Sequence, residues 1–263
     1  MTCLVSVITP TYNSADFIDA TIKSVLDQTY RNWEMIIVDD CSDDNTISIV
    51  SQYRAKDSRI QLICLDENSG AAVARNAAIE VAKGRFIAFV DSDDYWVPEK
   101  LEKQLVFMKK RNVSFSFSGY TTITEQDEII DYIKPPAKVT FRKMLKHNYI
   151  SCLTAIYDTK PYGKVYMPLI KKRQDYALWL MLLQKFDSAY SLQESLAFYR
   201  IRKQSLSKNK FDALRYFWLV LRTVANLPLI SSIYYVALYA LIVGLKKLFP
   251  KIYNFLIRKS SQN

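Results

Sequence analysis

Apolar and polar residues alternate along the first ninety positions in a way that predicts strands and helices in turn. Short β-branched apolar runs indicate buried strands, and apolar residues recurring every three or four positions indicate helices. The predicted strands cover residues 4–9, 33–38, 60–65 and 86–90. The predicted helices cover residues 15–28, 47–53 and 71–82. This alternation predicts a largely parallel sheet with helices on both faces.

The second half of the chain continues the alternation less regularly. Further strands are predicted over residues 114–122 and 149–158, and further helices over residues 99–111 and 174–183. An acidic turn around residues 125–128 and the Pro135-Pro136 pair interrupt this half, and the prolines predict a flexible segment. At 263 residues, half of them apolar, the chain is long enough for one large α/β domain with an appendage.

Three carboxylates directly follow the strand predicted over residues 86–90. Asp91, Asp93 and Asp94 repel one another, so packing alone does not explain them at the end of a buried strand. An Asp-x-Asp pair can hold a divalent cation through oxygen ligands, with phosphates and water completing the shell. The same residues also fit a solvated acidic turn that caps the next helix. Asp91 and Asp93 are therefore candidate metal ligands, and the role of Asp94 stays open.

Acidic residues also end the second strand and open a later helix. Asp39 and Asp40 follow the strand over residues 33–38, and Asp175 lies in the first turn of the helix that starts at residue 174. Ligands of open α/β sheets bind beyond the carboxyl ends of the strands, so we expect the polar strand ends to share one crevice. Asp39 and Asp40 also fit helix caps, and the helix dipole favours an acid at Asp175.

The net charge of +10 is concentrated at the C-terminal end. Residues 1–200 hold 25 Lys+Arg and 25 Asp+Glu, whereas residues 201–263 hold 11 Lys+Arg and one acid. This asymmetry predicts a neutral body with a basic segment for an anionic surface, either a membrane or a nucleic acid. The basic residues flank an apolar stretch and do not alternate with stacking aromatics, so we expect no nucleic-acid partner.

The tail contains an uncharged stretch over residues 223–245. Its length suffices for a bilayer crossing, but both flanks are positive, with Arg222 before it and Lys246 after it. Pro228 and several polar residues also lower its hydrophobicity. We therefore predict a helix that lies in the membrane plane or inserts partly, so that residues 223–263 bind the inner membrane surface. The alternative is a helix packed on the main domain or on a dimer partner.

Cysteine and histidine usage narrows the chemistry further. The four cysteines form no CxxC pair and no secretory signal precedes them, which favours reduced thiols in a cytosolic protein. His147 is the single histidine. A histidine-based triad and a histidine-rich metal site are therefore excluded.

The order of five segments resembles a known enzyme family. The segments are VSVITPTYNSADFI, IIVDDCSDDNT, NSGAAVARN, GRFIAFVDSDDYW and RQDYALWLMLL. In this order they resemble the inverting nucleotide-sugar glycosyltransferases of family 2, which have the GT-A fold, and the similarity covers roughly residues 4–200. The sequence of these segments is most similar to bacterial glycosyltransferases of the teichuronic-acid, capsule and O-antigen kind. The resemblance implies a Rossmann-like, mostly parallel sheet flanked by helices, and the pattern of the tail adds a C-terminal helical membrane-associating segment.

The resemblance also implies roles for individual residues. Asp175 would be the general base that takes the proton from the acceptor hydroxyl. Asp91 and Asp93 would hold Mn²⁺ or Mg²⁺, and Asp93 is the preferred direct ligand of the two. The nucleotide sugar would be bound by a wider set: Thr9, Pro10, Tyr12, Asn13, Asp39, Asp40, Arg75, Asp91, Ser92 and Arg200.

Within this set, the nucleotide base would lie against residues 9–13. Asp39 or Asp40 would accept hydrogen bonds from the uracil or the ribose. Arg75 would face the diphosphate, for which a guanidinium is well shaped, although it also fits a surface ion pair.

Two positions depart from the family pattern. Gln174 stands where the family commonly has Glu, so the base role rests on Asp175 alone. Arg202 replaces a histidine that the family often carries, and Arg200 would contact a phosphate or the acceptor.

Together these features predict a bacterial enzyme at the cytoplasmic face of the cell membrane. It would move a sugar from a UDP-sugar to a polyprenyl-diphosphate-linked glycan during surface polysaccharide synthesis. The catalytic domain would cover residues 1–205, with a nucleotide-binding half (1–96) and an acceptor half (97–205), and residues 206–263 would form the tail. The alternatives are a nucleotidyltransferase, which normally has a glycine-rich phosphate loop after the first strand, and a non-catalytic sugar-nucleotide-binding protein at the membrane.

Overall fold

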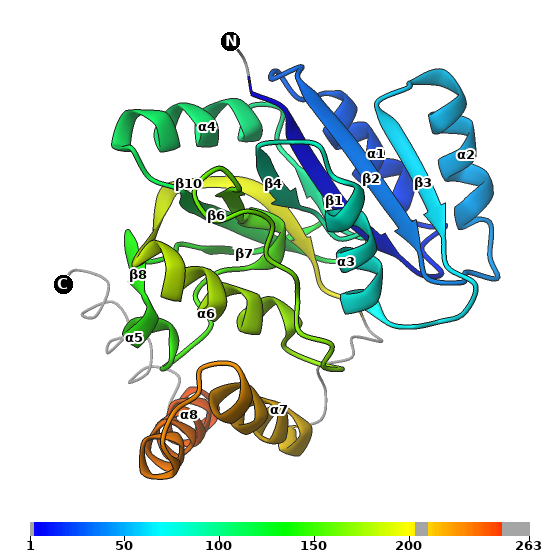
Figure 1. Cartoon of the computed structure of the whole chain (residues 1–263). Coiled ribbons are helices and arrows are strands. Elements are labelled where there is room, and N and C mark those ends of the chain that lie inside the picture. Colours follow the sequence, from blue (N-terminus) through cyan, green and yellow to red (C-terminus); the bar gives the residue numbers. More distant parts are fainter. Residues whose placement is uncertain (1–2, 203–209, 249–263) are drawn as a thin grey trace.

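The chain folds around one mixed β-sheet (Figure 1). A computed structural model describes residues 3–202 and 210–248. The strands are β1 (Val5–Thr11), β2 (Trp33–Asp39), β3 (Ile60–Cys64), β4 (Phe86–Phe89), β5 (Tyr95–Trp96), β6 (Phe115–Ile123), β7 (Ile129–Ile133), β8 (Lys138–Thr140), β9 (Ile156–Asp158) and β10 (Ser188–Arg200). The helices are α1 (Ile18–Leu26), α2 (Thr46–Lys56), α3 (Ala71–Val81), α4 (Lys100–Arg111), α5 (Phe141–Met144), α6 (Gln174–Phe186), α7 (Lys210–Thr223) and α8 (Leu229–Leu248), with one 3-10 turn at Cys152–Thr154.

The sheet confirms the predicted α/β fold and places the acidic strand ends. Its order is β3-β2-β1-β4-β9-β6-β10-β5, with β7 beside β6 and β8 beside β10. The first four strands are parallel, so β1, β2 and β4 end at the same edge. Beyond β4 the sheet is mixed, because β9 runs antiparallel to both β4 and β6. One continuous sheet therefore joins the two predicted halves of the domain.

Buried strand residues divide between two cores, one on each face of the sheet. Val7 of β1 packs with α1, α2 and α4, whereas its neighbour Ile8 packs with α3 and α6. Successive strand residues point to opposite faces, and both faces are covered, so β1 is buried on both sides. The first half therefore folds as its apolar runs predict.

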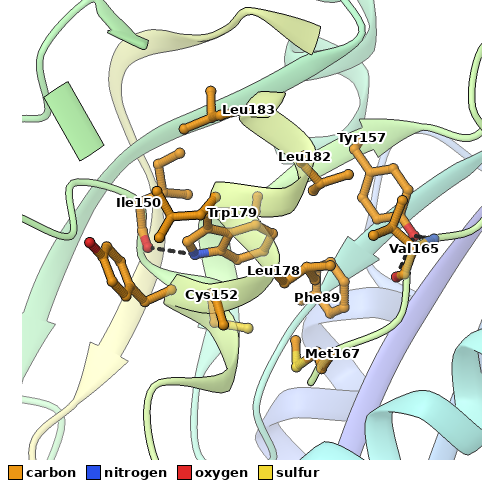
Figure 2. Close-up of a cluster of buried hydrophobic side chains, with 14 of the residues drawn as sticks. Phe89, Ile150, Cys152, Tyr157, Val165, Met167, Leu178, Trp179, Leu182 and Leu183 are labelled. Carbon is orange, nitrogen blue, oxygen red and sulfur yellow. Dashed lines mark hydrogen bonds between the residues drawn. The ribbon is translucent and has the colours of Figure 1, made fainter. Parts of the chain in front are cut away.

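Helix α6 is anchored by Trp179 at the centre of the second core (Figure 2). The indole Nε1 donates a hydrogen bond to the carbonyl of Ile150 at 3.1 Å. The Trp179 ring meets Phe89 of β4 edge-on at a centroid distance of 5.6 Å. A fully buried tryptophan with its N–H satisfied fixes the helix against the sheet. The first turn of α6 is thereby held close to the end of β4.

The predicted strand over residues 149–158 is wrong in its first part. The structure has a 3-10 turn at Cys152–Thr154, and only Ile156–Asp158 pairs as β9. Side chains bind the carbonyls that a strand would use, since Trp96 donates to Leu153 and Gln104 donates to Thr154. Tertiary hydrogen bonds therefore override the β-branched and apolar composition of this segment.

Strand β10 is missing from the sequence-based prediction. It is a 13-residue strand between β6 and β5. Its register against β6 shifts between Leu192 and Ser195 and again between Ser195 and Phe198. These irregularities break the period-two pattern by which strands are recognised.

The tail begins with a helical hairpin of α7 and α8 that lies beside α6 (Figure 1). Phe217, Val220 and Leu221 of α7 are buried in the core that contains α6. The outer side of α8 is different, since Ile230 is 82% exposed and Leu229, Ile233, Tyr234 and Leu241 are also exposed. Packing on the main domain and an exposed apolar face thus coexist in one hairpin.

No helix in the described ranges combines the length and the apolar character that a bilayer crossing requires. The C-terminal basic residues beyond position 248 lie outside the described residues.

Candidate active site

Arg75 reaches the end of β4 from α3. Its Nη2 lies 2.5 Å from Oδ1 of Asp91. Arg75 is 7% exposed, and its buried Nε has no hydrogen-bond partner in the described structure. Burial disfavours the guanidinium charge, but the adjacent Asp91 outweighs this effect and raises the pKa of Arg75. Arg75 is therefore a fixed cation at the strand end with one N–H still to be satisfied.

Asp93 lies beside a second arginine. Nη1 of Arg202 is 3.7 Å from Oδ2 of Asp93, which makes this ion pair looser than the one between Arg75 and Asp91. Burial and then the charge of Asp91 raise the pKa of Asp93 above its ordinary value. Repulsion between Asp91 and Asp93 is therefore only partly compensated by the surrounding protein.

Asp94 and Ser92 hold the loop after β4 in place. Oδ1 of Asp94 accepts a hydrogen bond from the backbone N–H of Arg200 at 2.9 Å. Thr21 of α1 donates to the carbonyls of Asp94 and Ser92, and the hydroxyls of Ser92 and Ser14 lie 2.8 Å apart. Burial raises the pKa of Asp94 well above its ordinary value. Asp94 thus ties the loop to β10, and its side chain is turned into the protein.

The two acids after β2 are bound by nearby loops. The carboxylate of Asp39 accepts from the N–H of Ser42 at 2.8 Å and from its hydroxyl at 2.6 Å. The carboxylate of Asp40 accepts from the N–H groups of Ser69 and Gly70 at 2.7 and 2.8 Å. Gly70 has a φ of 90°, which favours glycine, and it immediately precedes α3. Asp40 therefore shapes the loop that leads to Arg75.

The residues predicted to line the nucleotide base lie at the end of β1. Thr9 and Pro10 are buried, and the hydroxyl of Thr9 has no hydrogen-bond partner in the described structure. Tyr12 is 48% exposed, so its ring is accessible to a ligand. Asn13 accepts a hydrogen bond from the N–H of Asp43 and has a φ of 45°. These residues form the end of β1 and the start of the loop that follows it, beside the Asp39 loop at the shared edge of the sheet.

Asp175 lies in the first turn of α6 and faces an amide partner. Its Oδ2 accepts a hydrogen bond from Nδ2 of Asn148 at 3.2 Å. Burial raises the pKa of Asp175, and the N–H of Tyr176 and the charge of Arg75 only partly offset this effect. A carboxylate with a raised pKa is suited to accept a proton.

Arg200 is bound on all sides by protein groups. Its guanidinium donates to the carbonyls of Asp93, Thr124 and Glu125 and pairs with Asp127 at 2.9 Å. Arg200 as a whole is only 5% exposed. Contact with a phosphate or an acceptor stays a prediction for Arg200, because such a contact would require some of these bonds to break.

A cleft of about 780 Å³ brings Arg75, Asp91 and Asp175 together. In the described part of the chain, its lining does not include the residues at the ends of β1 and β2. Four tyrosines also line it: Tyr120, Tyr132, Tyr149 and Tyr199. Aromatic faces with polar tips, next to a few charged groups, are typical of a site for a small molecule.

Sequence reasoning missed several residues of this cleft. Asn148 lies in a loop with no local motif, and its partner Asp175 is 27 residues further on. Tyr120 and Tyr199 come from β6 and β10, which are neighbours in the sheet, and their rings lie 6.1 Å apart. The alternation within β6 was the available signal for Tyr120, whereas the irregular β10 offered none for Tyr199.

The two candidate metal ligands fit a loosely held cation. Among residues 3–202 and 210–248, no three or more His, Cys, Asp or Glu side chains are grouped to hold a metal ion. The side chains of Asp91 and Asp93 are 28% and 25% exposed, so each leaves room for a ligand. Burial and the charge of Asp91 raise the pKa of Asp93, and a bound positive charge would offset both effects. The pair therefore suits a cation that takes its other ligands from phosphates and water.

Comparison with known proteins identifies the class. The family model for glycosyl transferase family 2 matches residues 6–226, so the chain belongs to this family and is a glycosyltransferase. The domain has the GT-A fold, as in S. aureus TarS bound to UDP. That structure has a TM-score of 0.68 and is 24% identical, and the match covers 90% of this chain and 70% of that chain.

Two bacterial relatives are similar over nearly the whole chain. One is TuaG of Bacillus subtilis (strain 168), whose name assigns it to teichuronic acid biosynthesis; it is 48% identical over 90% of this chain and 94% of that protein. The other is WfgD of Escherichia coli, named as a UDP-Glc:alpha-D-GlcNAc-diphosphoundecaprenol beta-1,3-glucosyltransferase. It is 42% identical over 93% of this chain and 94% of its own length.

Proposed function

We propose that this glycosyltransferase moves a sugar from a UDP-sugar to a glycan linked to a polyprenyl diphosphate, in the synthesis of a bacterial surface polysaccharide. The observation that carries the proposal is the meeting of Arg75, Asp91 and Asp175 in one tyrosine-lined cleft. The donor is supported by the UDP-bound structure of TarS, and the acceptor by the printed activity of WfgD.

The reaction is a single in-line displacement. The acceptor hydroxyl oxygen attacks C1 of the donor sugar, its proton passes to Asp175, and the bond between C1 and the diphosphate oxygen breaks. UDP leaves with the bonding electron pair, and the anomeric centre is inverted. The raised pKa of Asp175 supports its role as the base, since a stronger base takes the proton more readily. Asn148 orients the carboxylate through its hydrogen bond.

The donor nucleotide would lie at the ends of β1 and β2. Thr9, Pro10, Tyr12 and Asn13 would contact the base, and the exposed ring of Tyr12 supports this placement. Oxygens of Asp39 or Asp40 with spare lone pairs would accept from the uracil or ribose, in addition to their loop bonds. Ser92 would shape the floor of this site through its contact with Ser14.

The diphosphate would lie next to the arginines at the end of β4. The unsatisfied Nε of Arg75 supports a hydrogen bond to a phosphate oxygen. Asp91 and Asp93 would hold Mn²⁺ or Mg²⁺, and that ion would neutralise charge on the departing diphosphate. A structure of similar fold, the mannosyltransferase PcManGT of Pyrobaculum calidifontis, contains GDP-Man and Mn²⁺ (TM-score 0.64, 15% identity, 98% of this chain and 79% of that chain).

The tail would hold the enzyme at the cytoplasmic face of the cell membrane, where the lipid-linked acceptor lies. The exposed apolar side of α8, led by Ile230 and Ile233, supports an in-plane contact with lipid. The excess of basic residues after position 200 supports attraction to anionic headgroups. In this proposal residues 1–205 form the catalytic domain, in halves 1–96 and 97–205, and residues 206–263 form the membrane-binding tail.

The catalytic proposal is tested with purified protein, UDP-glucose and a short-chain GlcNAc-diphospholipid, followed by mass spectrometry of the product. We expect transfer by the wild-type protein and a loss of about 10³-fold or more for Asp175→Asn, which cannot accept the proton. Other UDP-sugars are offered in parallel, because the donor sugar is set by the shape of the site. Wild-type turnover by Asp175→Asn would contradict the role of Asp175 as the base.

The membrane proposal is tested with the double variant Ile230→Glu with Ile233→Glu. We expect the wild-type protein to sediment with anionic vesicles and the variant to stay in solution, because two charges oppose insertion of the apolar side of α8. Vesicles of neutral lipid serve as the control for the electrostatic contribution to vesicle binding. Equal sedimentation of both proteins with anionic vesicles would refute lipid contact through this side of α8.

A further inference from the structure

Both helices of the α7–α8 hairpin bind Arg173, the residue that immediately precedes α6. Nε of Arg173 donates to the carbonyl of Ala213 in α7 at 3.1 Å, and its Nη2 donates to the hydroxyl of Tyr239 in α8 at 2.7 Å. One guanidinium thus bonds to both helices of the hairpin. The fork geometry of arginine allows two such bonds in fixed directions.

Aromatic rings close around the same guanidinium. Its central carbon lies 4.9 Å from the ring centroid of Tyr239 and 5.2 Å from that of Phe217. The two rings stack on each other at 4.7 Å, and Phe217 is fully buried. A cation enclosed by aromatic faces is held more firmly than one in water. Next to it, Lys172 pairs with Asp212 of α7 at 3.0 Å and adds a second link to the hairpin.

The backbone of Arg173 links these contacts to the first turn of α6, which carries Asp175. Arg173 has a φ of 65° and a ψ of 28°, a left-handed conformation that is unfavourable for a residue with a long side chain. Its carbonyl accepts the N–H of Ala177 in the first turn of α6. Asp175 lies in that same turn, two residues beyond Arg173. The hairpin therefore stabilises the conformation from which the turn carrying Asp175 begins.

We infer that Arg173 is a positioning residue through which the C-terminal hairpin sets the orientation of Asp175 toward the acceptor. The inference rests on the proposed function of Asp175 as the base. It gives the hairpin a role in the chemical step that is separate from lipid binding. If the hairpin were an anchor alone, its contacts with Arg173 would be dispensable whenever the acceptor is soluble.

The test uses the full chain, a water-soluble short-chain acceptor and no vesicles. Arg173→Asn removes the guanidinium while asparagine tolerates the left-handed backbone, and Arg173→Lys keeps the charge. We expect kcat to fall about tenfold or more in Arg173→Asn, because small misplacements of a catalytic group carry large rate losses. The KM for the UDP-sugar should stay within about twofold of wild type, and Arg173→Lys should recover part of kcat.

A second variant removes only the hydroxyl oxygen that accepts the hydrogen bond from Arg173. Tyr239→Phe keeps the stacked rings and loses only the hydroxyl, and we expect kcat to fall about threefold. Arg142→Ala on the exposed side of α5 and Tyr162→Phe near the other end of α6 are the matched controls, and both should keep wild-type kcat. Thermal unfolding of each variant identifies any loss of folded protein.

The outcomes separate this inference from the proposed function. A folded Arg173→Asn variant with wild-type kcat, alongside an inactive Asp175→Asn variant, would overturn the positioning role and leave the base role standing. Wild-type activity in Asp175→Asn would instead overturn the base role itself. A rise in KM for the donor with unchanged kcat in Arg173→Asn would also contradict the inference, since it would indicate a binding effect.

Discussion

The ends of β2 and β4 carry the same kind of residue in two different states. Asp39 and Asp40 follow β2, and the loops around them satisfy their oxygens with N–H and hydroxyl groups. Asp91 and Asp93 follow β4, are partly exposed, and face arginines and each other. Carboxylates with close backbone donors build a loop, whereas carboxylates that still repel one another can attract a ligand. Identical side chains at equivalent strand ends thus differ in how far the protein already satisfies them: loops bind the acids after β2, whereas the acids after β4 keep more capacity for a ligand.

The comparison predicts the largest effect for a substitution after β4, which should lower the transferase activity. Asp93→Ala should lower kcat/KM by about 10²- to 10³-fold, because it removes one of the two carboxylates proposed to hold the cation that would neutralise the departing diphosphate. Its thermal midpoint should stay at or above that of the wild type, since repulsion with Asp91 is relieved. Steady-state kinetics and thermal unfolding of one preparation check both parts. Wild-type activity would place Asp93 with the structural acids.

The next largest effect is on stability at β2. Asp40→Ala should lower the free energy of unfolding by about 3 kcal/mol, because the N–H groups of Ser69 and Gly70 lose a charged acceptor. Urea denaturation measures the change, and Asp43→Ala on the exposed loop nearby is the control. A stability equal to wild type would show that the Asp40 bonds do not hold this loop.

The smallest effect concerns the pH dependence of transfer. Asp175 must be deprotonated to act as a base, and burial raises its pKa, so kcat should rise with pH at values above the ordinary range of aspartate. The Asn148 hydrogen bond favours the charged carboxylate. Asn148→Ala should therefore move this rise to higher pH. An unchanged pH profile of kcat would mean that the Asn148 amide does not tune the base.

The sequence predicted the parts of the fold that depend on local patterns. Apart from the short β5, the strands and helices up to α4 follow from continuous apolar runs and from helical spacing, and Asp91 and Arg75 were both identified as candidates. Strand β10 was missed because its register shifts disrupt the alternation. The turn at Cys152–Thr154 was missed because distant side chains bind its carbonyls.

The same distinction applies to the candidate site. The strand-end acids can be identified from the sequence because charged residues directly follow predicted buried strands. The partners of those acids are not, since Asn148 and Arg173 acquire their roles only when α6, a loop and the C-terminal hairpin meet. The enclosure of the Arg200 guanidinium by backbone carbonyls and Asp127 is likewise a tertiary feature that no local pattern announces.

A single displacement from a UDP-sugar inverts the anomeric centre, so the anomeric configuration of the product decides whether the proposed mechanism holds. The enzyme is incubated with an α-linked UDP-sugar and the lipid-diphosphate sugar acceptor, and the new linkage is assigned by proton NMR from its anomeric coupling. A β-linkage formed with one UDP released per sugar transferred is the predicted result. An α-linkage would contradict a single displacement assisted by Asp175.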